Sequence, residues 1–239
     1  MITTDIAILT GLTEQHVVNY QHTFSLHTAA VSPFNALCEA AKMSGIDIRI
    51  ASSFRSYQRQ AAIWHAKITG ARAVFDRDGN TVNIIELNGM AKLEAVLLYS
   101  ALPGASRHHW GTEVDIYDAA AVPADYKPRL MPEEYGQDGP FYAMQQWLKK
   151  YAAEFGFFQP YQVYQGGVAA EPWHLSYRPV AEQYLAQFSP LILRQCIAQH
   201  PLTAQDDKSS CNSSHNASKS LAKALPLLKM RQSSNACEC

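Results

Sequence analysis

Two short segments contain the residue types that a hydrolytic zinc site requires. Residues 106–115 read S-R-H-H-W-G-T-E-V-D, and residues 171–174 read E-P-W-H. They supply imidazoles, an aspartate, and a glutamate placed three residues before the last imidazole. Hydrolytic Zn²⁺ takes three protein ligands of the His/His/acid kind and keeps one coordination position open for water. Because a separate carboxylate must accept that water's proton, the segments predict a mononuclear zinc site with its own general base.

The first segment leads from a pair of histidines into a predicted strand over residues 112–117. Alternate side chains of a strand share a face, so Asp115 points with Glu113 while the residues between them point into the core. His108 precedes Gly111, where the chain can turn back and bring the imidazole next to Asp115. His109 is the rival ligand, and we expect it to face away.

The second segment places an acid close to an imidazole without making the acid a ligand. In an ideal strand Glu171 and His174 would lie on opposite faces. Pro172 breaks that geometry and fixes the backbone before Trp173, so Glu171 can lie beside the metal. We expect Trp173 to form a wall of the substrate pocket.

A third segment, S-S-F-R-S-Y-Q-R-Q over residues 52–60, contains Arg55 where a predicted strand runs into a helix. Residues in such loops often carry function. A guanidinium pairs bidentately with a carboxylate, as an exopeptidase that recognises a free C-terminus requires. The alternative for Arg55 is an ordinary surface ion pair.

The elements that must position these segments alternate without regular βαβ units, which predicts an α+β fold. Ser32 and Pro33 favour a helix start, and Gly45 its end. Alternating apolar residues predict strands over 46–50, 112–117, 161–164 and 173–176. Helical spacing predicts helices over 57–69, 90–101, 140–155 and 180–199, the last with a break at residue 190.

Composition predicts one globular domain and excludes several classes of partner. The chain has 239 residues, is 47% hydrophobic and carries a net charge of −1, so it has no electrostatic signature for nucleic acid or anionic membranes. No apolar stretch is long enough to span a bilayer. We expect a folded domain over residues 1–202. Residues 203–239 are polar and lack aromatic side chains, so we expect a disordered tail there.

The N-terminus lacks a basic region, a long apolar run and a small-residue cleavage site. These features predict a cytoplasmic protein. The alternative is a periplasmic protein whose leader has been removed.

The patterns S-x-H-x-x-G-x-x-x-D, E-x-W-H and F-R-S-x-x-x-Q together resemble those of the VanY-type D-alanyl-D-alanine carboxypeptidases. These are zinc peptidases related to the hedgehog signalling domain, and the resemblance covers roughly residues 25–180. It implies a single hedgehog/D-Ala-D-Ala peptidase-like domain with a central, mainly antiparallel sheet flanked by helices. One departure is Glu113, which occupies a position that is usually taken by a small residue such as Ala.

The resemblance also assigns roles within the site. It implies a single Zn²⁺ per chain, and Glu171 as the catalytic base. It further implies that Arg55 holds the substrate's terminal carboxylate, with Ser106 and Gln60 supporting the substrate. The implied metal ligands are His108, Asp115 and His174.

The implied function is release of C-terminal D-alanine from peptidoglycan stem peptides or muropeptides, by cleavage of a D,D- or an L,D-bond. Two alternatives stay open. Fe(II) oxygenases use a similar ligand set. By resemblance, those enzymes have one residue between the first His and the Asp, whereas six residues separate His108 from Asp115 here. A zinc-bearing peptidoglycan-binding module without catalysis would not require the base Glu171.

Overall fold

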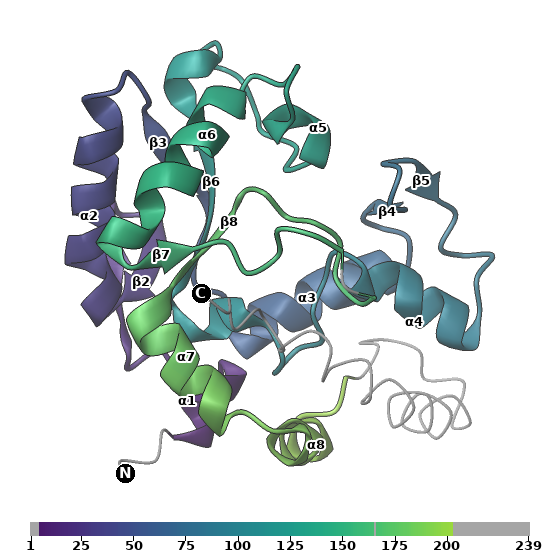
Figure 1. Cartoon of the computed structure of the whole chain (residues 1–239). Helices are drawn as coiled ribbons and strands as arrows, with labels where there is room; N and C mark the ends of the chain where they lie inside the picture. The colour runs from purple at the N-terminus through teal and green to yellow at the C-terminus, as the bar shows by residue number, and fades with distance from the viewer. Residues whose placement is uncertain (1–4, 165, 203–239) are drawn as a thin grey trace.

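The computed structural model describes residues 5–164 and 166–202, and its centre is a four-stranded antiparallel sheet (Figure 1). The strand order is β3-β6-β8-β7, with β3 at Ile48–Ser52, β6 at Glu113–Asp118, β8 at His174–Tyr177 and β7 at Phe157–Phe158. Two small antiparallel pairs accompany it: β1 (Val17–Tyr20) with β2 (Phe24–His27), and β4 (Val74–Phe75) with β5 (Thr81–Val82). The predicted α+β class with a mainly antiparallel sheet is confirmed.

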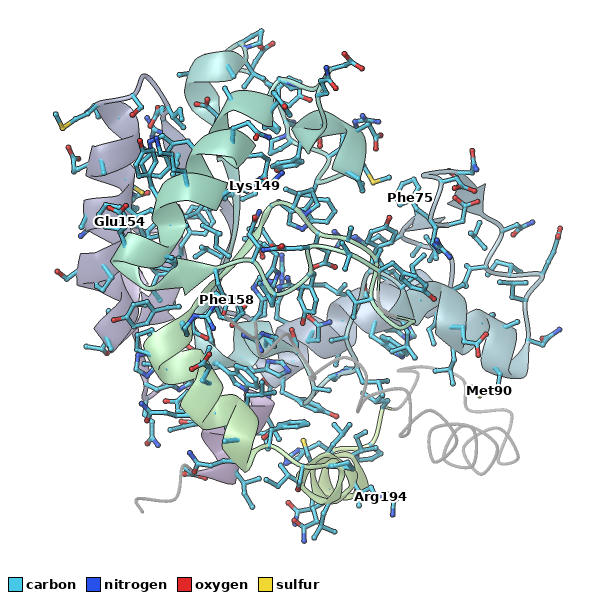
Figure 2. All side chains as sticks on the ribbon, viewed as in Figure 1. Phe75, Met90, Lys149, Glu154, Phe158 and Arg194 are labelled. Carbon is cyan, nitrogen blue, oxygen red and sulfur yellow. The ribbon has the colours of Figure 1, made fainter. Side chains whose placement is uncertain are left out.

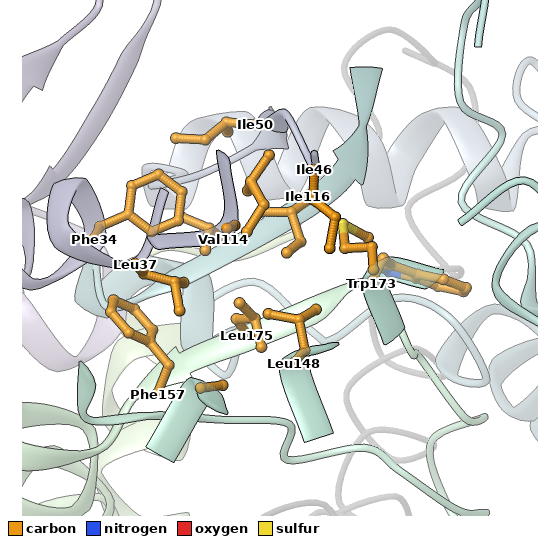
Figure 3. Packing of buried hydrophobic residues seen from close by; sticks show 14 of the residues in the cluster. Phe34, Leu37, Ile46, Ile50, Val114, Ile116, Leu148, Phe157, Trp173 and Leu175 are labelled. Carbon is orange, nitrogen blue, oxygen red and sulfur yellow. The ribbon is translucent and has the colours of Figure 1, made fainter. Parts of the chain in front are cut away.

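One face of the central sheet is covered by α2 (Thr28–Lys42) and α6 (Tyr142–Tyr151), as Figure 1 shows. A large apolar cluster fills the space between them, because the inward side chains of the strands and helices are apolar (Figure 3). Its central members are Phe34 and Leu37 of α2, Leu148 of α6, Val114 and Ile116 of β6, and Leu175 of β8.

A second apolar cluster lies among the remaining helices. It combines residues of α3 (Tyr57–Ile68), α4 (Gly89–Leu97), α7 (Arg178–Gln187) and α8 (Pro190–Gln199). Trp110, in a 3₁₀ turn over Arg107–Trp110, joins this cluster directly before β6 begins. The chain also forms α1 (Ile6–Thr10), α5 (Pro132–Tyr135) and 3₁₀ turns at Ala119–Ala121 and Ala152–Phe155.

The start predicted for α2 was wrong. The helix begins at Thr28, and Pro33 lies inside it rather than in its first turn. The imidazole of His27 caps the helix, because its Nδ1 accepts a hydrogen bond from the backbone N–H of Ala29 at 3.1 Å. A histidine cap directly after a strand gives no sequence signal comparable to Ser-Pro.

The strand predicted over residues 161–164 was also wrong, since these residues form a loop. A half-buried strand needs one buried face, yet Gln162, Val163 and Tyr164 are all exposed. The helices predicted over 57–69, 90–101, 140–155 and 180–199 are confirmed with small shifts of their ends. The tail prediction for 203–239 lies outside the described residues.

No helix in the part of the chain that the structure describes has both the length and the apolar character needed to cross a membrane.

Candidate metal centre

The 3₁₀ turn before β6 brings His108 next to Asp115. Gly111 ends the turn with φ +69°, and a Cβ atom there would lie only 2.4 Å from a methyl carbon of Val17. The position therefore requires glycine. The chain reverses at this point, so that Nε2 of His108 lies 3.4 Å from Oδ2 of Asp115.

Strand pairing brings the third candidate ligand to the same place. His174 on β8 stands opposite Asp115 on β6 in the antiparallel register. Its Nδ1 lies 3.1 Å from Oδ1 of Asp115, and its ring centroid is 4.8 Å from that of His108. The candidate ligand atoms of the three residues all lie within 4.8 Å of one another, and all three residues are buried.

Hydrogen bonds on the far side of each ring fix which nitrogen faces the cluster. The Nδ1–H of His108 donates to the backbone carbonyl of Ser53 at 2.8 Å, which leaves Nε2 as the inward atom. The Nε2–H of His174 donates to Oε2 of Glu113 at 2.6 Å, which leaves Nδ1 inward. Partners of this kind orient metal-binding histidines and raise their basicity.

Glu113 is the centre of a buried network that the sequence did not reveal. Besides His174, its carboxylate contacts Arg107 at 3.2 Å and accepts hydrogen bonds from the hydroxyls of Ser176 at 2.7 Å and Thr112 at 3.0 Å. Burial alone would raise the pKa of Glu113, but Arg107 and His174 lower it to about 2. The sequence could indicate Glu113 as a member of the site, because it shares a strand face with Asp115. No sequence feature indicated that Arg107 would be its partner.

The donor set fits a divalent metal ion. Oδ1 of Asp115 and Nδ1 of His174 are buried and have no hydrogen-bond partner among the described residues. Burial alone would lower the pKa of His174, yet the carboxylates of Asp115, Glu113 and Glu171 raise it well above its usual value. A buried site with this excess of negative charge favours a cation, and nitrogen and oxygen donors of this kind suit Zn²⁺.

Glu171 lies at the edge of the cluster. Its Oε2 is 3.4 Å from Nδ1 of His174. The backbone N–H of Glu171 donates to the carbonyl of Tyr161 at 2.8 Å, and the Tyr161 ring packs edge-on against His174 with centroids 5.0 Å apart. The loop that was predicted as a strand therefore holds the carboxylate beside the candidate ligands.

Arg55 is held by its backbone and its side chain. Its N–H donates to the carbonyl of His108 at 3.1 Å, and its carbonyl accepts from Nδ1 of His109 at 2.6 Å. Its guanidinium donates to Oε1 of Gln60 at 3.1 Å and lies 3.4 Å from Oδ2 of Asp115, while Nε has no hydrogen-bond partner among the described residues. His109 thus faces away from the cluster, as predicted, and fixes Arg55 instead.

These groups open onto a cavity of about 600 Å³. Ser106, Trp173, Glu171 and Arg55 line it together with the three candidate ligands. Gln60 is fully buried and does not line it, so its placement does not support the direct substrate contact that the resemblance implied. Because its amide donates to the carbonyl of Ala101 at 2.8 Å, Gln60 holds Arg55 from behind.

The chain is similar to a known family over most of its described residues. A family model described as VanY, D-alanyl-D-alanine carboxypeptidase, matches residues 23–180. An uncharacterized protein of Haemophilus influenzae is 44% identical over 96 residues, which are 39% of this chain and 73% of that protein. A D-alanyl-D-alanine carboxypeptidase of Enterococcus faecalis is 30% identical over 151 residues, which are 62% of this chain and 46% of that protein.

The solved structures that match the chain include VanYB in complex with D-alanine-D-alanine. It is 22% identical, the match covers 81% of this chain and 91% of that chain, and the TM-score is 0.48. The LdcB LD-carboxypeptidase is 24% identical, with 69% and 72% of the two chains covered and a TM-score of 0.41.

Proposed function

The chain belongs to the VanY family of D-alanyl-D-alanine carboxypeptidases, and from that premise we propose that it is a zinc carboxypeptidase that releases C-terminal D-alanine from peptidoglycan stem peptides. One observation carries the proposal. The candidate ligand atoms of His108, Asp115 and His174 converge within 4.8 Å in a buried cluster, and Glu171 and Arg55 line the same cavity.

The ligand set supports one Zn²⁺ per chain, with His108 coordinating through Nε2 and His174 through Nδ1. When bound, Zn²⁺ lowers the pKa of a water molecule to about 7 and polarises a carbonyl oxygen. Glu113 and Ser53 keep the two imidazoles in the tautomers that this role requires.

Glu171 is the proposed general base and acid. Its carboxylate lies beside the candidate ligands, 3.4 Å from Nδ1 of His174. There it accepts the proton of the attacking water and delivers it to the nitrogen of the departing D-alanine. General acid–base catalysis of this kind contributes about 10²- to 10⁴-fold to the rate.

Arg55 is the proposed clamp for the C-terminal carboxylate. Its Nε is a buried donor without a partner among the described residues, and a substrate carboxylate would satisfy it. Gln60 and the backbone contacts to the 3₁₀ turn hold the guanidinium in position. Ser106 and Trp173 line the cavity where the rest of the peptide would lie.

The test uses purified protein of known zinc content with two substrates. A stem tetrapeptide ending in D-alanine and a pentapeptide ending in D-alanyl-D-alanine are incubated separately, and released D-alanine is measured by mass spectrometry. We expect release from at least one peptide, loss of release after chelation, and recovery when zinc is restored. Which peptide reacts distinguishes L,D- from D,D-cleavage.

A base variant separates chemistry from metal binding. Glu171→Gln should lower turnover by about 10²- to 10⁴-fold and leave the zinc content unchanged. Glu182→Gln is the matched control, because Glu182 is an exposed acid on α7 that pairs with Arg178 and does not line the cavity. Zinc-loaded protein that binds the peptides without cleaving them would instead indicate a binding module. Activity that requires Fe(II) and yields an oxidised product would indicate an oxygenase.

A further inference from the structure

The cavity beside the candidate metal centre carries an excess of positive charge. Six arginine and lysine side chains line it, against only two acidic ones, Asp115 and Glu171. Both acids already belong to the candidate centre. Because the whole chain has a net charge of −1, this excess is a local property of the cavity.

Helix geometry arranges part of this charge in a row. Arg59, Ile63 and Lys67 follow each other at four-residue spacing along α3, so they share one face of the helix, and all three line the cavity. Arg55 precedes the helix on the side of the metal centre, and Arg72 lies in the segment between α3 and β4. The row therefore leads away from the position of the proposed carboxylate clamp.

Two of these cations, Arg59 and Arg72, have no counterion among the described residues. Arg107 contacts Glu113 at 3.2 Å, and Arg129 contacts Glu133 at 3.1 Å. The guanidinium groups of Arg59 and Arg72 make no hydrogen bond or ion pair with any residue in the ranges 5–164 and 166–202. Both residues are exposed at the cavity, where an incoming anion can reach them.

Arg59 and Arg72 also lie within electrostatic reach of the clamp. Burial lowers the pKa of Arg55, and the charges of Arg72 and Arg59 lower it further, against the opposite effect of Asp115 and Glu171. A single D-alanine does not need this much positive charge, since Arg55 alone can pair with one carboxylate. A cavity of about 600 Å³ also has room for residues that precede the departing amino acid.

We propose that Arg59 and Arg72 form a second anion subsite, which selects peptides with a free side-chain carboxylate upstream of the terminal D-alanine. This inference rests on the proposed carboxypeptidase function and specifies its substrate class. Arg55 binds the terminal carboxylate, and the subsite binds the second one. Peptides that carry a carboxamide at that position are poorer substrates.

The test compares two peptides that differ by one group. The first is a stem peptide of the length that the protein cleaves, tetrapeptide or pentapeptide, whose third residue ends in a free carboxylate. The second is the same peptide with that carboxylate as a carboxamide. The zinc-loaded protein should cleave the carboxylate peptide with a kcat/KM up to about fivefold higher, the upper end of the range for exposed charge pairs. Added salt should reduce this preference, because exposed charges are screened.

Three variants locate the preference. The double variant Arg59→Gln with Arg72→Gln should lose the preference by lowering kcat/KM for the carboxylate peptide alone. The matched control is Arg194→Gln, which removes an exposed arginine on α8 that does not line the cavity (Figure 2). Each single variant should lose part of the preference.

The outcomes separate this inference from the proposed function. Equal cleavage of both peptides by the wild-type protein, or an equal loss for both in the double variant, would overturn the subsite and leave the carboxypeptidase intact. Release of D-alanine from neither the tetrapeptide nor the pentapeptide, with either side chain, would overturn the proposed function itself. A preference that Arg194→Gln also removes would show a general effect of charge and would overturn the subsite.

Discussion

The two faces of strand β6 are buried to a similar extent, but one carries apolar side chains and the other carries carboxylates. Val114 and Ile116 are 2% and 0% exposed on one face, and Glu113 and Asp115 are 0% and 4% exposed on the other. The first pair packs in the apolar cluster under α2 and α6 (Figure 3). The second pair joins imidazoles and an arginine in a network of charges. Burial alone therefore does not distinguish the apolar face of β6, which packs in the core, from the polar face, which belongs to the candidate metal centre.

The difference lies in how each face is stabilised. Apolar burial is non-directional, so a shortened side chain costs contacts and leaves a cavity, but it strands no particular partner. In the charged network each atom depends on a particular partner, and an unpaired member is costly. We therefore expect substitutions on the apolar face to change stability, and substitutions on the polar face to change metal binding and turnover.

Asp115→Asn should have the largest effect. The amide keeps the size of the side chain but removes the negative charge between His108 and His174, so the site loses its anionic metal donor. We expect turnover to fall by more than about 10³-fold, comparable to the loss of general-base catalysis, together with loss of bound zinc. Elemental analysis and D-alanine release measure both; full activity with a full zinc content would contradict the ligand role.

Ile116→Ala tests the opposite face of the same strand. Ile116 is fully buried in the apolar cluster, and such truncations cost about 2–5 kcal/mol of unfolding free energy. We expect a shift of that size in urea unfolding, with kcat within about twofold of wild type at temperatures where the variant is folded. The control is Ile85→Ala, because Ile85 is 60% exposed. Loss of activity in folded Ile116→Ala would contradict the expectation that the apolar face of β6 affects stability and not turnover.

The sequence predicted the residues on the polar face of β6 better than it predicted the hydrogen bonds that hold the candidate ligands in place. Strand alternation placed Asp115 and Glu113 together, and Gly111 marked the turn that brings His108 back. It could not predict that the Nε2–H of His174 donates to Glu113, because that contact depends on the register of β8 against β6. Long-range pairing of this kind has no local sequence signal.

The same limit explains the errors in the fold. The loop over residues 161–164 has strand-forming residues, but its place is set by the cavity and by the hydrogen bond from Glu171 to Tyr161. The cap of α2 by His27 depends on a preceding β1–β2 hairpin, which had not been predicted. Helices such as α3 were predictable because their apolar spacing and the cap Ser56 are both local.

Glu113→Gln tests whether the polar face is one network. The amide oxygen can still accept from His174, but it lacks the charge that orients the ring and balances Arg107. We expect zinc affinity to fall by about 10- to 100-fold, the usual effect of losing such a partner. Titration against a colorimetric chelator measures it. Ser176→Ala removes a hydroxyl that donates to Glu113 and accepts from Arg107, but it leaves both charges in place. It should change the affinity less; an equal effect would mean that packing, not charge, matters.

His27→Asn tests whether a half-buried imidazole outside the candidate centre takes part in the chemistry, and it should have the smallest effect. Nδ1 of His27 accepts the capping hydrogen bond of Ala29 and Nε2 contacts the hydroxyl of Tyr184 at 3.0 Å, so the ring must stay neutral. Burial, with a smaller contribution from His16, lowers the pKa of His27 to about 4. Between the ordinary value of about 6.5 and that value, the unfolded chain binds more protons, so stability falls as the pH falls through this window.

An asparagine can still cap the helix but does not titrate. The drop in unfolding free energy between about pH 6.5 and pH 4 should therefore be smaller in His27→Asn by about 1–2 kcal/mol, a figure reduced for the partial exposure of the ring. Turnover at neutral pH should stay unchanged, because His27 does not line the cavity. Parallel acid titrations followed by circular dichroism measure the difference. Identical curves would show that the imidazole of His27 is not what acid disrupts, and lost turnover would extend the chemical region beyond the polar face of β6.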